Sequence, residues 1–460
     1  MRRSAKLRAV ALTLAGWLTL AACGGSGGDE PAAAGSACPV DALKDAAGPV
    51  EIQFWHSRSA EVEKTLQNLV QQYNSSQSKV KVVLSQQGPA ADLTAKYNSA
   101  IGPNQLPDLV DVDPKRLRSF IDKGTLMPAE SCVRASGGNL DQIVPVVRNT
   151  YTLDGKYWPG FAHVTVPVLY YNKAQFSKAG LDPDKPPATL TELLDDARKL
   201  KAAGVKAPLS FRQDPQIINS WLAGAGADIV SNGNGRKGPA DKSTFDNPTT
   251  RTVYQWLHDM KADGLLKEYP FSLASPDHFL SIVNQTATMT IDTSSAASSV
   301  KAFLAGKTIP GLDLVAAPLP GVTKAGQVNV DGGGFYLVSK SSPAKQAAAW
   351  DFMKFMQGKD NLVTWNKEGS AVPFVKGISD DPALQAFYKT DSAGKILAVA
   401  ADELARVDPN NPAPAIGPYD QFERTLNAST ENLLSGGKPV DDVVKTTDTA
   451  LNDALKQYNG

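Results

Sequence analysis

From Val50 onward, the sequence alternates between two hydrophobic periods, and this alternation restricts the fold more than any other feature. Val50, Ile52 and Phe54 alternate with polar neighbours as in a strand, whereas the apolar residues of 62–73 recur every three or four positions, as on one face of a helix. The exchange is repeated along the chain, for example where "KVKVVLS" follows the first helical segment. Strands that alternate with helices predict an α/β fold with largely parallel sheets.

The length of the chain indicates more than one domain. Roughly 410 residues follow position 47, and the whole sequence is 42% hydrophobic without a long low-complexity stretch. This is too large for one simple core and predicts two domains. In parallel sheets, ligands bind beyond the carboxyl ends of strands, where loops lead into helices. Residues 55–58 and Asp113 stand at such strand ends and are the first candidates for a ligand site.

The N-terminus predicts export. Four basic residues within the first eight positions precede the apolar run 9–20, which is shorter than the ~20 residues that span a bilayer, so residues 1–22 are expected to be a secretory signal. The run ends in "LAAC", and "GGSGGDEPAAAGSA" follows. This resembles the bacterial lipobox, with Cys23 as the lipid-modified mature N-terminus and residues 23–47 as a flexible tether. An ordinary signal peptide with a chance cysteine is the alternative.

Charge, cysteines and histidines exclude several classes of function. Residues 1–22 hold four of the 47 basic groups and none of the 47 acidic ones, so the chain without them has a formal charge of −4. This balance gives no support to a nucleic acid as partner, which would need a basic face. Cys38 and Cys132 predict one disulfide in an exported protein, with two buried thiols as the alternative. The four histidines have no i, i+4 spacing, and we expect no metal site, no cofactor and no catalytic residue.

One motif match is dismissed at this level. The glycines at 233, 235 and 238 in "SNGNGRKGPAD" fit the dinucleotide-binding fingerprint. Pro239 and Asp241 follow where a helix should begin. We therefore expect a surface loop rather than a nucleotide site.

Four segments carry a resemblance to a known family. They are "EIQFWHS" with the helix after it, the stretch 166–204 that begins "VPVLYYNKAQFSKAGLDPDKPP", the pair "TATMTIDTSSAASSV" and "VDGGGFYLV", and "AAAWDFMKFMQGKDNLVTWNKEGSAVP". Over residues 48–460 the chain resembles the bacterial extracellular solute-binding proteins of the carbohydrate-importer class, and within them the glycerol-3-phosphate-binding branch.

The resemblance implies an α/β fold of two lobes that close on a ligand in the cleft between them, like a clamp around a hinge. It places residues 48–161 and 287–338 in the first lobe and residues 162–286 and 339–460 in the second. The chain would cross between the lobes near 161–166 and return near 286–292. The implied protein is a monomer, anchored by lipidated Cys23 to the outer face of the bacterial cytoplasmic membrane, that delivers its small-molecule ligand to the permease of an ABC importer.

The first group of candidate ligand residues follows the first strand. A sugar has apolar C–H faces and a rim of hydroxyls, so its site needs aromatic rings beside polar groups. Trp55, Ser57 and Arg58 supply this mixture, unless Trp55 packs under the first helix and Arg58 is a solvated helix start. Asp111 and Asp113 point to the same face of their strand. Asp113 is the better candidate to accept sugar hydroxyls, with capping of the next helix as the alternative.

Further candidates lie near the crossing segments. Asp292 and Thr293 precede a helix start, where exposed amides attract an oxygen-rich ligand or are simply capped. Gly333 and Gly334 permit either close approach of a ligand or a hinge with unusual dihedral angles. Weaker candidates are His163, Thr165, Phe211, Arg212 and Tyr419.

The sequence departs from the glycerol-3-phosphate-binding branch at three points of that branch's pattern, one of which is an arginine that pairs with phosphate. The branch has a tyrosine after the second strand, a tyrosine after the late helix pair and an arginine near the C-terminal segment. The corresponding stretches here read "QQGPAADL", "GSAVPF" and "PAIGPYDQF". A phosphate without that arginine would lose a charge-assisted contact. A neutral mono- or oligosaccharide is therefore the favoured ligand, and a glycerophosphodiester or glycerol 3-phosphate is the alternative, with Arg58 or Arg212 as the replacing cation.

The resulting hypothesis is a lipid-anchored receptor without enzymatic activity that populates a closed state on binding sugar. A secreted carbohydrate hydrolase is the second class, but it needs opposed carboxylates with separated pKa values, and no such pair is recognisable. A third class, an adhesin or sensor, would use the same clamp without a permease.

Overall fold

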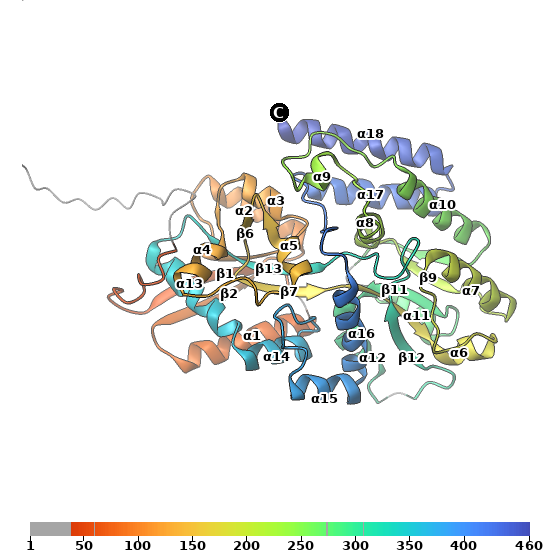
Figure 1. Ribbon diagram of the computed structural model, residues 1–460, viewed down its shortest axis with the longest axis horizontal. Coiled ribbons are helices and arrows are strands. Elements are labelled where there is room, and N and C mark those ends of the chain that lie inside the picture. The colour runs from red at the N-terminus through yellow and green to blue at the C-terminus, as the bar shows by residue number, and fades with distance from the viewer. Residues whose placement is uncertain (1–37, 59, 273–274, 307) are drawn as a thin grey trace, which may run out of the picture. The chain divides into compact units, whose positions relative to one another are not determined.

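The computed structural model describes residues 38–460 with the exception of 59, 273–274 and 307. Over this part of the chain, each lobe is built on one sheet with helices packed around it (Figure 1). Residues 1–22, expected to be a secretory signal, Cys23 and the part of the expected tether up to residue 37 lie outside the described residues. Within the described ranges, no helix has both the length and the apolar character needed to cross a membrane.

The first lobe contains a six-stranded sheet in the order β2-β1-β3-β13-β4, with β7 also paired to β13, as counted over the described residues. Its strands are β1 Val50–His56, β2 Val80–Gln86, β3 Leu109–Val112, β4 Leu126–Met127, β7 Phe161–Thr165 and β13 Asp331–Val338. The short pair β5 Thr152–Leu153 and β6 Lys156–Tyr157 lies beside it. The helices of this lobe are α1 Ala60–Ser76, α2 Ala90–Ile101, α3 Leu117–Asp122, α4 Ala129–Ala135, α5 Pro145–Tyr151, α13 Pro343–Met356 and α14 Lys359–Glu368.

The second lobe contains a five-stranded sheet in the order β10-β9-β11-β8-β12, again over the described residues. Its strands are β8 Pro167–Asn172, β9 Leu209–Arg212, β10 Leu266–Tyr269, β11 Met289–Thr293 and β12 Leu314–Pro318. Its helices are α6 Lys173–Lys178, α7 Leu190–Ala202, α8 Pro215–Gly224, α9 Ser231–Gly235, α10 Pro248–Ala262, α11 Asp277–Val283, η1 Ser294–Ala296, α12 Ala297–Leu304, α16 Ser392–Arg406, α17 Tyr419–Leu434 and α18 Val440–Asn459. Helix α15, Pro382–Thr390, packs between α14 and α16.

Local sequence explains the elements at the start of the chain. Ile52 and Phe54 of β1 are fully buried, and Leu66, Leu69 and Tyr73 of α1 form its buried stripe, as the two periods predict. Capping marks helix starts elsewhere: the Thr189 hydroxyl accepts the N–H of Glu192 at 3.2 Å at the start of α7.

The predicted α/β class with two lobes is confirmed, but the sheets are mixed rather than largely parallel. β1 runs parallel to β2 and β3, and β9 runs parallel to β10 and β11. β13 is antiparallel to β3, and β8 is antiparallel to β11 and β12. The reversed strands β8 and β13 are those that arrive from the other lobe. Because the parallel strands point their carboxyl ends toward the other lobe, a strand that enters from there must run the opposite way.

The chain leaves the first sheet at Thr165 and enters the second at Pro167, within the crossing segment expected near 161–166. The expected return near 286–292 is wrong, because β11 and β12 both pair in the second sheet and the return follows β12, through residues 319–330. Residues 287–318 therefore belong to the second lobe. The assignment of 339–368 to the second lobe is also wrong, since α13 packs on β1 and β13, and α14 packs on α1.

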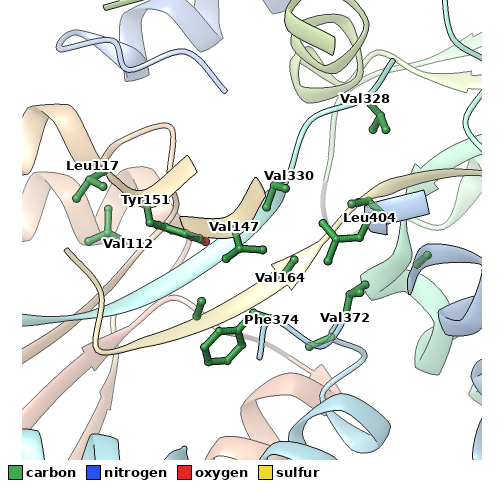
Figure 2. Close-up of a cluster of buried hydrophobic side chains, with 14 of the residues drawn as sticks. Val112, Leu117, Val147, Tyr151, Val164, Val328, Val330, Val372, Phe374 and Leu404 are labelled. Atoms are coloured by element: carbon green, nitrogen blue, oxygen red, sulfur yellow. The ribbon is translucent and has the colours of Figure 1, made fainter. Parts of the chain in front are cut away.

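Apolar side chains pack around the segments that connect the two sheets. Figure 2 shows Val164 on β7, Val328 and Val330 on the segment before β13, and Leu404 on α16. A third connection, after α14, runs along β7, where the N–H of Val372 donates to the carbonyl of Val164 at 2.7 Å. The hinge region thus contains mainly buried apolar contacts.

Cys38 and Cys132 form the disulfide that their presence in an exported chain predicts. Their Cα atoms are 4.8 Å apart, and 94 positions separate them in the sequence. Cys132 lies on α4, and both residues are buried. The bond ties the start of the described chain to the first lobe.

Candidate ligand-binding site

An ion pair between Arg58 and Asp111 lies at the carboxyl edge of the first sheet. Arg58 follows β1 and donates from Nε and Nη2 to the two carboxylate oxygens of Asp111 on β3, each at 2.5 Å. The side chains are 14% and 1% exposed. Burial opposes the positive charge, but the neighbouring Asp111 outweighs this and raises the pKa of Arg58. Arg58 is therefore fixed against its own sheet by a bidentate contact rather than being a solvated helix start.

The glycines of β13 make room for this pair and for the neighbouring strand. A Cβ at Gly333 would lie 1.9 Å from Arg58 Nη2, and one at Gly334 would lie 2.8 Å from the Cβ of Pro159. Gly332 has a φ of +119°, and a Cβ there would lie 1.9 Å from the carbonyl oxygen of His163. Close approach of the chain itself thus accounts for this glycine run.

Asp113, Lys115 and Arg116 follow β3. Asp113 accepts the backbone N–H of Arg116 at 3.0 Å and pairs with its guanidinium at 2.5 Å. Burial alone would raise the pKa of Asp113, but Arg116 and Lys115 outweigh it and lower that pKa. Lys115 pairs with Asp331, the first residue of β13, at 3.0 Å. The carboxylate of Asp113 therefore stabilises the turn after β3, and it does not cap the next helix, because α3 starts at Leu117 with Arg116 as an N-cap that has no side-chain hydrogen bond.

The carboxyl edge of the second sheet holds a second charge network. Arg212 ends β9 and donates from Nη2 to Asp214 at 2.9 Å and to Asp292 at 3.0 Å. The other carboxylate oxygen of Asp292 lies 2.7 Å from Nε2 of His278. Burial opposes the charge on Asp292, but Arg212 and His278 lower its pKa. Thr293 donates its N–H to Asp292 at 2.6 Å.

Arg116 connects the two lobes. Its Nε donates to Asp420 of α17 at 2.6 Å, its Nη2 donates to Glu423, and the guanidinium lies 5.3 Å from the centre of the Tyr419 ring. The Arg116 side chain is 5% exposed. We call Asp113, Arg116, Asp420 and Glu423 the inter-lobe clasp. Lys115 also acts electrostatically on Asp214 of the second lobe, so the carboxyl edges of the two sheets meet here.

Arg236 makes a second connection, from the loop that we expected at the surface. Its guanidinium donates to the carbonyl of Thr150 at 2.9 Å and, through Nε, to that of Ala413 at 2.8 Å. Burial lowers the pKa of Arg236 to about 10. Asn234 and Gly235 are buried, and the carbonyl of Asn234 accepts the N–H of Ala415 at 2.8 Å. The segment was expected to be a loop at the surface. This is wrong in one respect, since part of the segment is buried and packs between the lobes.

The remaining predicted residues are distributed around these networks. Trp55 is half-buried, and the Lys96 ammonium lies 4.5 Å from its ring centre. His163 packs edge-on against Trp365, and burial, assisted by Arg58, holds the pKa of His163 well below its usual value. Phe211 is fully buried and stacks on Trp221 in the core. Thr165 is buried in register with Asp331 on β13, and Ser57 is half-buried.

Sequence reasoning missed most of the polar residues where the lobes meet. Lys115, Arg116 and Asp331 sit next to predicted positions, and Asp331 directly precedes the glycine run. Gln216 and Asn219 of α8 are buried, and Asn219 donates to the Tyr419 hydroxyl at 3.2 Å. A polar start to an otherwise apolar helix was the available signal for these two. No group of acidic, histidine or cysteine side chains suited to a metal ion occurs among the residues that the structure describes.

Two lobes that meet through the carboxyl edges of their sheets define a ligand-binding fold of the periplasmic type. The family model of the bacterial extracellular solute-binding proteins matches residues 57–362. The chain belongs to this family, and the resemblance of its segments to that family is confirmed.

Similar proteins include both phosphate-compound and sugar receptors. The sn-glycerol-3-phosphate-binding periplasmic protein UgpB of Pectobacterium atrosepticum is 24% identical over 439 residues, which are 92% of this chain and 94% of that protein. The crystal structure of a cyclic alpha-maltosyl-1,6-maltose binding protein from Arthrobacter globiformis matches 90% of this chain and 100% of its own, with a TM-score of 0.71 and 23% identity. UgpB from Mycobacterium tuberculosis in complex with glycerophosphocholine matches 90% and 99%, with a TM-score of 0.72 and 18% identity.

Proposed function

We propose that this chain is the lipid-anchored substrate-binding protein of an ABC importer and that it captures a neutral mono- or oligosaccharide. It binds the sugar where the two sheet edges meet, closes its lobes and delivers the ligand to the permease without catalysing a reaction. Among the predicted residues, Asp113, Arg212 and Asp292 take part in the charge networks at these edges, and Tyr419 lies against Arg116. Membership of an extracellular binding-protein family supports the receptor role.

The pairing of charges is the observation that carries the choice of a neutral ligand. Arg58, Lys115, Arg116 and Arg212 each contact a carboxylate, and the acidic groups in these networks outnumber the four cations. The acidic groups are Asp111, Asp113, Asp214, Asp292, Asp331, Asp420 and Glu423. A phosphate placed here would meet cations that are already paired and an excess of negative charge. A neutral sugar meets no such repulsion.

Glycerol 3-phosphate or a glycerophosphodiester is the second candidate. The curated relatives that bind glycerol 3-phosphate favour it, as does Arg236, a cation between the lobes that donates to the backbone carbonyls of Ala413 and Thr150. A hydrolase is disfavoured, because Asp111 and Asp113 each hold an arginine. An adhesin or sensor role would share the same site and differ in the absence of a permease.

Calorimetric titration with two groups of compounds tests the ligand class. Maltose, maltotriose and trehalose form the neutral group, and sn-glycerol 3-phosphate and glycerophosphocholine form the phosphate group. We expect tightest binding within the neutral group, and a compound at 100 times its Kd should add ~2.7 kcal/mol to the free energy of unfolding. Tightest binding of a phosphate compound, together with loss of that binding in Arg236→Gln, would establish the second candidate instead.

The lipid anchor is tested separately through Cys23. In a bacterial host that processes lipoproteins, the native chain should partition with membranes, and Cys23→Ala should be released in soluble form because the acylated residue is gone. Metabolic labelling with a fatty-acid analogue provides the second measurement. Equal membrane association of both forms would refute the anchor.

A further inference from the structure

The start of α8 places polar side chains at the meeting point of the lobes. Asp214 caps the helix, accepting the N–H of Gln216 at 2.9 Å, and Pro215 occupies the first turn. Gln216 and Asn219 are three positions apart and share one face of the helix. They are 5% and 3% exposed. Tyr419 of α17, next to the inter-lobe clasp, contacts Asn219 on this face.

A third amide lies against the same helix. Asn329, on the segment before β13, donates its N–H to the Ser220 hydroxyl at 2.9 Å and its amide Nδ2 to the Asn219 carbonyl at 3.4 Å. A Cβ at Gly224 would lie 2.3 Å from the backbone nitrogen of Val328, so this segment runs directly along α8. Figure 2 shows Val328 and Val330 on either side of Asn329 in that segment.

These side chains have unused hydrogen-bonding capacity. Gln216 Oε1, Asn219 Oδ1 and Asn329 Oδ1 are buried without a hydrogen-bond partner among the described residues. Arg212 Nε, at the end of β9 two positions before the Asp214 cap, is also buried and unpaired. The set therefore offers three acceptors and one donor. A buried acceptor without a partner is unfavourable by about 1–3 kcal/mol, and buried polar groups in folded proteins are normally paired.

The chemistry of the set selects its ligand. Three acceptors need three donors, and a hydroxyl group both donates and accepts. The oxygens of an ionised phosphodiester only accept, so they would face Gln216, Asn219 and Asn329 without forming hydrogen bonds. A vicinal polyol matches the set, with its hydroxyls donating to the amide oxygens and one oxygen accepting from Arg212 Nε.

We propose that Gln216, Asn219, Asn329 and the Nε of Arg212 form a subsite that reads the hydroxyl groups of a polyhydroxylated ligand. This inference rests on the proposed function, because it assumes that the solute binds between the lobes. It specifies that function further, by assigning hydroxyl recognition to α8 rather than to the carboxylates at the sheet edges.

Two substitutions test the subsite. Gln216→Met and Asn219→Leu remove an acceptor at nearly constant volume, and Thr250→Val is the matched control, because the Thr250 hydroxyl is also buried and unpaired but lies on α10. Titration with maltose should give a Kd about 10-fold higher in each of the two variants and unchanged in the control. Thermal unfolding without ligand should show no loss of stability in Gln216→Met, which removes an unpaired oxygen, and a small loss in Asn219→Leu, which also removes the hydrogen bond to the Tyr419 hydroxyl.

A second measurement compares the native chain with the same two variants over a series of ligands. Maltose analogues that each lack one hydroxyl should include members with about 10-fold weaker binding, and these should lose no further affinity in Gln216→Met or Asn219→Leu. The subsite would be overturned, and the receptor function left intact, by an unchanged Kd for maltose in both variants when thermal unfolding shows that both are folded. Tight binding of glycerophosphocholine that depends on Gln216 and Asn219 would instead keep the subsite, through glycerol hydroxyls, and refute the neutral-saccharide function.

Discussion

Glu403 allows a quantitative test of the packing beside the hinge. It lies in α16, one position before Leu404. Leu404 belongs with Val164 and Val372 to the apolar side chains around the connecting segments, which we call the hinge cluster (Figure 2). Glu403 is 0% exposed. Neither carboxylate oxygen has a hydrogen-bond partner among the described residues. Burial, opposed weakly by Arg406, raises the pKa of Glu403 from 4.5 to about 7. Between about pH 5 and pH 7, the folded protein therefore keeps a proton on Glu403 that the unfolded chain has largely released.

The sign of the resulting pH dependence follows from linkage. Between the unfolded pKa of 4.5 and the folded pKa of about 7, the folded state binds more protons, so the free energy of unfolding falls as pH rises through this window. A difference of about 2.5 pKa units corresponds to about 3 kcal/mol, and most of this loss falls between pH 5 and pH 8. Above pH 8 the loss from this group is complete.

Replacement of Glu403 by Gln removes the titration and keeps a neutral polar side chain of the same size. We expect the stability of Glu403→Gln relative to the native chain to increase by about 2–3 kcal/mol from pH 5 to pH 8. Urea denaturation at the two pH values measures this difference, in which the contributions of other groups cancel. Asp402→Asn, at an exposed position of the same helix, should follow the native pH dependence. Equal pH dependence in the native chain and Glu403→Gln would refute the assignment of a buried, unpaired carboxyl.

Two further predictions concern the clasp and the disulfide. Glu423→Gln should weaken binding of the solute about 3- to 10-fold at low ionic strength, because it removes one of two ion pairs from Arg116 to α17. The difference in Kd between Glu423→Gln and the native chain should vanish at 1 M salt. The control Glu431→Gln, at an exposed position of the same helix, should leave the Kd unchanged. The Cys38→Ala, Cys132→Ala double variant should lose ~2–4 kcal/mol of unfolding free energy, since the native bond closes a loop of 94 positions; equal urea midpoints for native and double-variant chains would contradict this.

Local periodicity was sufficient to predict where the carboxyl edges of the sheets lie. The strand that ends before Arg58 and the one that ends before Asp113 each alternate polar and apolar residues over a few positions, and this pattern needs no knowledge of the rest of the chain. Asp292 was expected where a strand meets a helix start, and Arg212, named only as a weaker candidate, lies at the end of β9. The carboxyl edges of both sheets could therefore be located from the sequence alone.

The partners of these charges could not be predicted in the same way. Arg58 and Asp111 are 53 positions apart, and Arg116 and Glu423 are 307 positions apart. No local pattern records such a pairing, because it depends on the order of strands in the sheet and on the docking of α17. Gly333 is a similar case. The sequence predicted that some group approaches the backbone closely at this glycine or that the chain hinges there, but only the three-dimensional structure identifies Arg58 as the group that occupies the space.

The misplaced return crossing has a different origin. β11 and β12 are short strands of five residues each, and strands of this length fit equally well into either sheet. Their pairing with β8 decides the matter, and β8 itself arrives from the first lobe. The sequence pattern specifies a strand, whereas membership of a lobe is decided by contacts between strands that are distant in the chain.

The clasp also changes how the salt dependence of binding has to be interpreted. The hinge cluster of Val164, Val372 and Leu404 is apolar, and apolar contacts are non-directional and insensitive to screening. The contacts of Arg116 with Asp420 and Glu423 are directional ion pairs at partly exposed carboxylates, so salt weakens them and favours separation of the lobes. A neutral sugar that binds the closed lobes would then lose affinity at high salt without carrying any charge. Salt sensitivity in the native chain is therefore no proof of a phosphate ligand, but salt sensitivity that persists in an Asp420→Asn, Glu423→Gln double variant, which lacks both ion pairs, would be strong support for one.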